Sequence, residues 1–60
     1  MNKTTVRVSD YYGHPEYYPF MARDMFAALE SAFLNDAVSV AVDTGQLEQL
    51  LNDYKKHHES

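Results

Sequence analysis

The stretch that most constrains the fold runs from Pro19 to Leu34, PFMARDMFAALESAFL, and its apolar residues repeat with the period of an α-helix. At about 100° per residue, these apolar side chains fall within one arc of about 160°, which leaves Arg23, Asp24 and Glu30 outside it. The arc holds Met21, Ala22, Met25, Phe26, Ala28, Leu29, Ala32 and Phe33. Such a stripe needs a cover, so we expect the rest of the chain to pack against this helix.

Two short segments alternate in the way of a strand that is buried on one face. In Thr4 to Ser9 and in Ala37 to Val42, the valines face one way and the small or polar residues face the other. If these strands are neighbours, the helix between them predicts a right-handed βαβ unit with parallel strands. Antiparallel pairing is an alternative, and so is edge pairing across a homodimer, because an isolated two-stranded sheet is weak.

The segments around the first helix carry turn signals. Asp10 to Tyr18 contains Gly13 and Pro15, which predicts an irregular connection. Pro19 suits the first turn of a helix, where its missing N–H has no partner. Phe20 and Leu34 fall on the polar side of the helix, so we expect them either to fold back against loops or to be exposed. The helix should end near residues 35–36, Asn and Asp, which tolerate left-handed geometry.

A second helix is predicted after the second strand. Asp43 is the N-cap candidate, and Gln46 stands at the capping-box position three residues later. A narrow apolar stripe follows, and cations suit the end of the helix, where we expect the last residues to fray. The stripe is Leu47, Leu50, Leu51, Tyr54 and His58, and the terminal cations are Lys55, Lys56 and His57.

Together these segments predict one small α+β domain over residues 1–60, in the order β-loop-α-β-α, with two short strands packed against two amphipathic helices. The ordered core should span about residues 4–56. A chain of this size buries only about 60% of its unfolded surface, and the absence of cysteine removes disulfides, so self-association or a partner is the expected supplement. No apolar run reaches about 18 residues, so we expect a cytoplasmic protein without a membrane span.

Charge is distributed unevenly along the chain. The formal net charge is −4, and residues 24–53 contain six acids and no Lys or Arg. Such a field repels nucleic acid and attracts basic surfaces. Evenly spaced acids also simply keep a small domain in solution, which is the plainer alternative. The six acids are Asp24, Glu30, Asp36, Asp43, Glu48 and Asp53.

The sequence shows no specific catalytic or metal-binding motif. His14, with Asp10 and Glu16 nearby, could form a carboxylate and imidazole pair, but these are more simply exposed turn residues. His57 and His58 are adjacent, and adjacent helical positions point in different directions, so they make a poor ligand pair. We therefore expect no cofactor, no metal and no enzymatic activity.

The connection is rich in tyrosine, which offers a large amphipathic area at low entropic cost and is favoured at protein interfaces. The same rings could instead roof a core that is short of apolar residues, and a mixture of both roles is possible. The four tyrosines are Tyr11, Tyr12, Tyr17 and Tyr18.

These features favour a non-enzymatic protein that binds the basic surface of a nucleic-acid-binding partner through its acids and tyrosines, and thereby inhibits it. In size and charge the chain is similar to small inhibitors encoded by phages and mobile elements, including anti-CRISPR and antirestriction proteins that mimic DNA. The alternative is a small structural or accessory subunit that assembles through apolar or strand-edge contacts, with Phe20 and Leu34 exposed.

Overall fold

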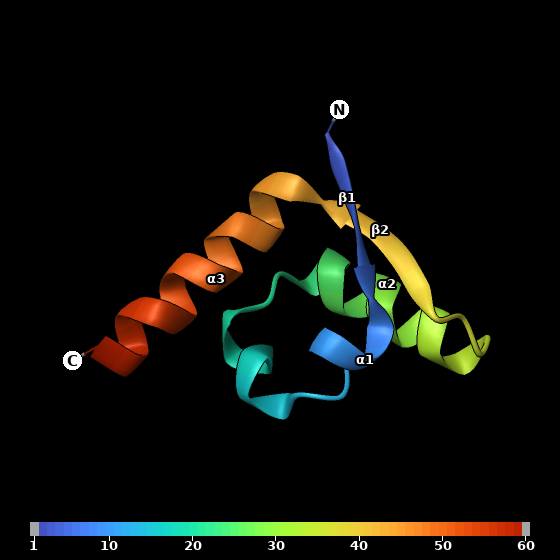
Figure 1. Cartoon of the computed structure of the whole chain (residues 1–60), viewed down its shortest axis with the longest axis horizontal. Helices are drawn as coiled ribbons and strands as arrows, with labels where there is room; N and C mark the ends of the chain where they lie inside the picture. The colour runs from blue at the N-terminus through green and yellow to red at the C-terminus, as the bar shows by residue number, and fades with distance from the viewer. Residues whose placement is uncertain (1, 60) are drawn as a thin grey trace.

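Two antiparallel strands form the sheet of the computed structural model, which describes residues 2–59. β1 (Lys3–Arg7) pairs with β2 (Ser39–Asp43) along their whole length, and the rest of the chain is helical or irregular (Figure 1). Arg7, which ends β1, lies opposite Ser39, which begins β2, so the connection between the strands leaves and returns at the same end of the sheet. This pairing decides between parallel and antiparallel strands: the fold is α+β, and the parallel βαβ unit does not occur. Edge pairing across a homodimer stays a prediction.

The first strand is shorter than its valine pattern predicts. β1 ends at Arg7, and Val8 begins a single helical turn, α1 (Val8–Tyr11). The prediction that the strand continues to Ser9 was wrong. Val6 and Val8 are both buried, at 8% and 5% exposure, although Val8 lies in a helical turn, so the alternation of buried valines does not require a strand at Val8. The N–H of Val8 still donates to the carbonyl oxygen of Val38 at 2.9 Å, so the chain stays beside β2 as it turns.

The connection that follows is more regular than expected. Pro15–Phe20 forms a 3₁₀ helix, η1, and Pro19 lies inside it. The prediction that Pro19 opens the central helix was therefore wrong. Met21 and Ala22 have extended backbones, with ψ of 133° and 149°, so α2 begins only at Arg23.

The central helix ends where predicted. α2 (Arg23–Leu34) is followed by Asp36, which has a left-handed φ of 58°. Its buried face is narrower than the predicted stripe and consists of Met25, Leu29 and Ala32. Phe33 is 54% exposed, because it lies near the end of the helix beyond the core. The prediction that Phe33 belongs to the buried stripe was therefore wrong.

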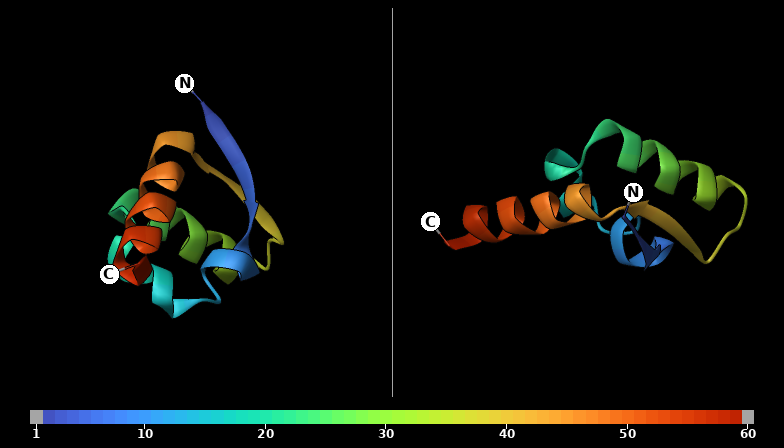
Figure 2. Two further views of the ribbon diagram at one scale, coloured as in Figure 1. Left: turned by 60° about the vertical axis from the view of Figure 1, so that its left-hand side comes forward. Right: turned by 90° about the horizontal axis from the view of Figure 1, so that it is seen from above.

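The last helix begins as predicted. α3 (Thr44–Glu59) follows β2 directly, and Oδ1 of Asp43 accepts a hydrogen bond from the N–H of Gln46 at 3.1 Å. This is the N-cap that the sequence indicates. α3 leaves the sheet at an angle, and its later turns lie beside η1 (Figures 1 and 2).

The core is formed where both strands, α2 and α3 meet. Leu29 and Leu50 are fully buried, and Phe20 is half-buried against this cluster, whereas Leu34 is 73% exposed. Within residues 2–59 no helix has the length and apolar character needed to cross a membrane. The core cluster is Val6, Met25, Leu29, Val42, Leu47 and Leu50.

Candidate protein-binding surface

The four tyrosines of the connection divide into two pairs of half-buried rings. Tyr11 contacts Tyr17 at a ring-centroid distance of 5.4 Å, and Tyr17 contacts Tyr54 of α3 at 4.7 Å. This pair therefore packs the connection against α3 through Tyr17. Burial raises the pKa of the Tyr11 hydroxyl, and neighbouring Tyr17 and Asp10 raise it further.

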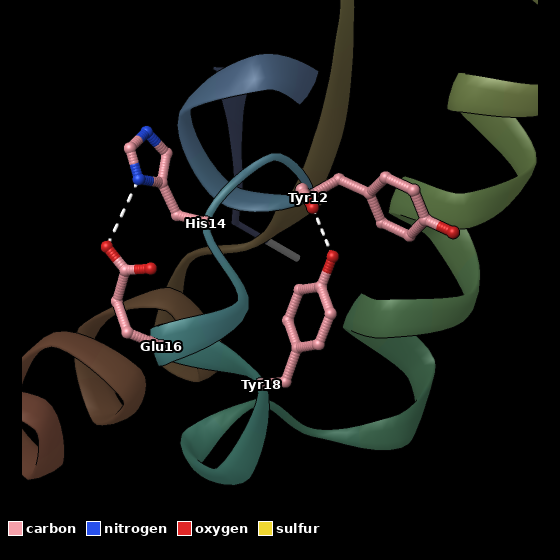
Figure 3. A network of polar contacts seen from close by, with 4 residues as sticks. All are labelled: Tyr12, His14, Glu16 and Tyr18. Atoms are coloured by element: carbon pink, nitrogen blue, oxygen red, sulfur yellow. Dashed lines mark hydrogen bonds and ion pairs between the residues drawn. The ribbon is translucent and has the colours of Figure 1, made fainter.

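The second tyrosine pair lies on α2. The ring of Tyr12 is 5.0 Å from that of Phe33 and 5.6 Å from that of Phe26, and Tyr18 is 4.9 Å from Phe26. Tyr18 also donates its hydroxyl hydrogen bond to the backbone carbonyl oxygen of Tyr12, which ties η1 to the end of α1 (Figure 3). Each of these rings covers apolar residues while part of its surface remains in contact with water. The role of these rings as core cover is therefore observed, and their role at an interface stays a prediction.

An apolar hollow of about 320 Å³ opens beside Tyr12. We call it the Tyr12 hollow. Its volume lies at the lower end of that of ligand pockets, about 300–1,000 Å³. Its sides come from α1 and the turn after it, and from the end of α2 and the residues before β2. The lining residues are Val8, Ser9, Tyr12, Gly13, Phe33, Ala37 and Val38.

Two of the predicted acids lie close to this hollow. Glu30 Oε2 accepts a hydrogen bond from the Tyr12 hydroxyl at 3.5 Å, and Asp36 directly precedes Ala37. Burial raises the pKa of the Tyr12 hydroxyl, and the charge and hydrogen bond of Glu30 raise it further. Both carboxylates are exposed.

Two more acids share a different hollow with a cation. Asp24, in the first turn of α2, and Asp43, at the end of β2, line a hollow of about 210 Å³ together with Lys3. Asp43 also holds the N-terminus of α3, so it has a structural role in addition to any role in binding. Nearby Lys3 weakens the negative potential at this position.

The last two acids lie on α3. Glu48 and Asp53 are separated by about 140° around the helix at about 100° per residue. Glu48 is exposed, whereas Asp53 accepts hydrogen bonds from Gln49 at 3.0 and 3.1 Å and shares a surface hollow with Lys55 and Lys56.

The six carboxylates are thus spread along a molecule that measures 37 × 26 × 16 Å. The α2–β2 connection, which holds Asp36, and the later turns of α3, which hold Asp53, lie at opposite ends (Figure 1). Among residues 2–59, however, no ion pair joins any of the six to a Lys or Arg. Of the six acids, Glu30, Asp36 and Glu48 line none of the three hollows described above.

One histidine forms the carboxylate and imidazole contact that the sequence suggests, and the other two contact aromatic rings. His14 Nδ1 lies 3.1 Å from Glu16 Oε2, and both side chains are about half exposed (Figure 3). The hydrogen bond to its own backbone N–H and the nearby His14 lower the pKa of Glu16. On α3, His58 contacts the Tyr54 ring at 4.3 Å and His57 contacts Phe20 at 5.4 Å. Within residues 2–59, no group of side chains is arranged to hold a metal ion.

Comparisons with protein-family models, with curated proteins and with solved structures gave no match. The functional argument therefore rests on the chemistry of this surface.

Proposed function

We propose that this chain is a non-enzymatic binding protein that occupies the basic, nucleic-acid-binding surface of a partner protein and inhibits it. Its carboxylates would stand where phosphates of DNA or RNA otherwise lie. This is the mode of action of the small phage and mobile-element inhibitors that the chain resembles in size and charge.

The proposal is supported chiefly by the unpaired state of the acids. No Lys or Arg among residues 2–59 forms an ion pair with the six carboxylates, so the exposed ones among them face solvent and any approaching cation. Glu30, Asp36 and Glu48 are exposed and line neither of the two hollows that contain lysine, so we assign the charged contacts chiefly to them. The half-buried tyrosines add apolar contact area that needs little ordering on binding.

The experiment is capture followed by competition. The chain is immobilised and exposed to the heparin-binding fraction of a bacterial extract, and bound proteins are eluted with salt. We expect the eluted partner to be basic, to be released by added DNA or RNA, and to lose nucleic-acid binding when the free chain is added. Screening weakens contacts between exposed charges, so binding should fall steeply as salt increases.

A matched pair of variants separates a local contact from net charge. Glu48→Lys and Glu59→Lys lie on the same helix, and each raises the net charge by two. Glu48 belongs to the proposed contact set, while Glu59 shares a hollow with Lys55 and Lys56. We expect Glu48→Lys to weaken binding to the purified partner more than Glu59→Lys. Equal effects of the two variants, or a partner that nucleic acid does not displace, would contradict the proposal.

A second candidate function is an accessory subunit that assembles through apolar contacts. The exposure of Leu34 and Val38, at 73% and 72%, favours it, and β1 and β2 each have a free edge in a sheet of two strands. Phe20 does not contribute, because it is half-buried against the core. Light scattering distinguishes the two functions: an accessory subunit that pairs with itself forms dimers that persist at high salt.

A further inference from the structure

The Tyr12 hollow is apolar, open to water and held in shape by backbone contacts. Val38 is 72% exposed and Phe33 is 54% exposed at its edge. The hydrogen bond from Val8 N–H to the Val38 carbonyl oxygen, 2.9 Å long, fixes one side against the other. Gly13 lines the hollow at a close backbone approach, because a Cβ at this position would lie only 2.8 Å from the carbonyl oxygen of Ser9. The hollow is therefore formed before any partner arrives.

The charges around this hollow are mostly negative. Asp36 precedes one lining residue, Asp10 follows another, and Glu30 is hydrogen-bonded to the Tyr12 hydroxyl. Arg7 is the nearest cation in the sequence, directly before Val8. Arg7 lies one position after buried Val6 in β1, and alternation along a strand places the two side chains on opposite faces of the sheet. The side chain of Arg7 therefore lies on the exposed face of the sheet, away from the face that Val6 buries.

This charge pattern selects among possible occupants. A second copy that used the same surface on both subunits would bring the acids of one rim against those of the other, which is unfavourable. A partner segment that carries Lys or Arg around an apolar side chain meets opposite charge at the rim and an apolar surface inside. Charge complementarity therefore favours a basic partner over self-pairing.

We propose that the Tyr12 hollow receives one large apolar side chain from a partner segment in which that side chain is flanked by Lys or Arg. The inference rests on the proposed function and deepens it: the hollow supplies an anchor, and Glu30 and Asp36 supply the charged contacts. A standard protein interface buries about 800 Å² per partner, which is about a fifth of the 4328 Å² surface of this chain. A contact of that size centred on the hollow also covers its acidic rim.

The test uses three synthetic peptides and amide chemical shifts measured by two-dimensional NMR. The first peptide has a central phenylalanine flanked by lysines, the second has glycine in place of the phenylalanine, and the third has glutamates in place of the lysines. We expect the first peptide to bind at least tenfold more tightly than either of the others. Its shift changes should centre on Gly13 and Val38.

Two variants with matched exposure test the position. Val38→Ser removes an apolar wall of the hollow, and Leu34→Ser removes a side chain of the same exposure that does not line it. We expect Val38→Ser to lower the affinity for the phenylalanine peptide about tenfold, because one apolar contact is lost. Leu34→Ser should leave the affinity unchanged. In Asp36→Asn, the asparagine tolerates the left-handed backbone at this position. This variant should bind both lysine-containing peptides more weakly, because one acidic contact is lost.

Three outcomes would overturn the inference. Equal binding of the phenylalanine and glycine peptides would show that charge alone attracts the peptide. Chemical-shift changes centred away from the hollow would place the anchor elsewhere. Dimers of the chain that dissociate on Val38→Ser substitution would show that a second copy is the occupant. Failure of this inference is distinguishable from failure of the proposed function. If only the inference fails, Glu48→Lys still weakens binding of the captured partner, while Val38→Ser leaves that binding unchanged.

Discussion

Leu50 and Leu51 are neighbours on α3, and the structure predicts very different consequences for the same substitution. Leu50 is 0% exposed and belongs to the core cluster, whereas Leu51 is 41% exposed. Leu50→Ala and Leu51→Ala therefore remove the same atoms from two environments. The sequence stripe places both leucines on the apolar face, so the comparison tests what the structure adds.

The expected magnitudes follow from the burial of the two side chains. Loss of apolar transfer is worth about 0.8 kcal/mol per CH₂ group, or about 2.4 kcal/mol for the three carbons. A cavity left at Leu50 raises the total to about 3–4 kcal/mol, while Leu51 keeps much of its surface in water and should cost about 1 kcal/mol. A chain of 60 residues has about 3–9 kcal/mol of stability in all. Leu50→Ala thus removes a large part of it.

Urea unfolding followed by far-ultraviolet circular dichroism measures this difference. With a slope of about 1 kcal/mol per molar urea for a protein this small, Leu50→Ala should lower the midpoint by about 3 M and Leu51→Ala by about 1 M. Equal shifts for the two variants would refute the reasoning, because they would mean that α3 is rotated about its axis or is not packed on the core.

The remaining predictions concern a cap, a close contact and two titrations. Asp43→Ala should destabilise the domain by about 1 kcal/mol in urea unfolding, while Asp43→Asn, which keeps the N-cap acceptor, should not. Gly13→Ala should cost about 1–3 kcal/mol by the same assay, because its Cβ meets a backbone oxygen at 2.8 Å. The raised pKa values of Tyr11 and Tyr12 favour the protonated hydroxyl in the folded state. Their contribution to stability is present below about pH 10 and is lost as the pH rises further. Absorbance titration should detect this late ionisation, and early ionisation of all tyrosines would contradict it.

The parts of the fold that the sequence predicts correctly are those set by local chemistry. The end of α2 shortly before Asp36 and the start of α3 directly after Asp43 depend on residues that suit left-handed geometry and N-caps. The burial of Leu29 and Leu50 follows from helical periodicity. These features need no knowledge of the rest of the chain.

The parts that the sequence does not predict depend on contacts between distant segments. Val8 continues an alternating pattern yet begins a helical turn, and Pro19 suits a helix start yet lies within η1. The Tyr12 hollow arises because α1 and the α2–β2 connection meet, and residue patterns along the chain carry no signal of that meeting. Glu30 and Asp36, which lie near this hollow, are among the six acids that the sequence indicates. The sequence pattern does not distinguish them from the other four.

The packing of the tyrosine rings gives the protein its own optical reporter. The chain has five tyrosines and no tryptophan, so tyrosine dominates its ultraviolet emission, because its three phenylalanines emit only weakly. Tyr12 lines the hollow, and Tyr17 is in ring contact with Tyr54 of α3. Arrival of a partner at either place changes the surroundings of a fluorophore that is already present, so association can be followed without attaching a dye.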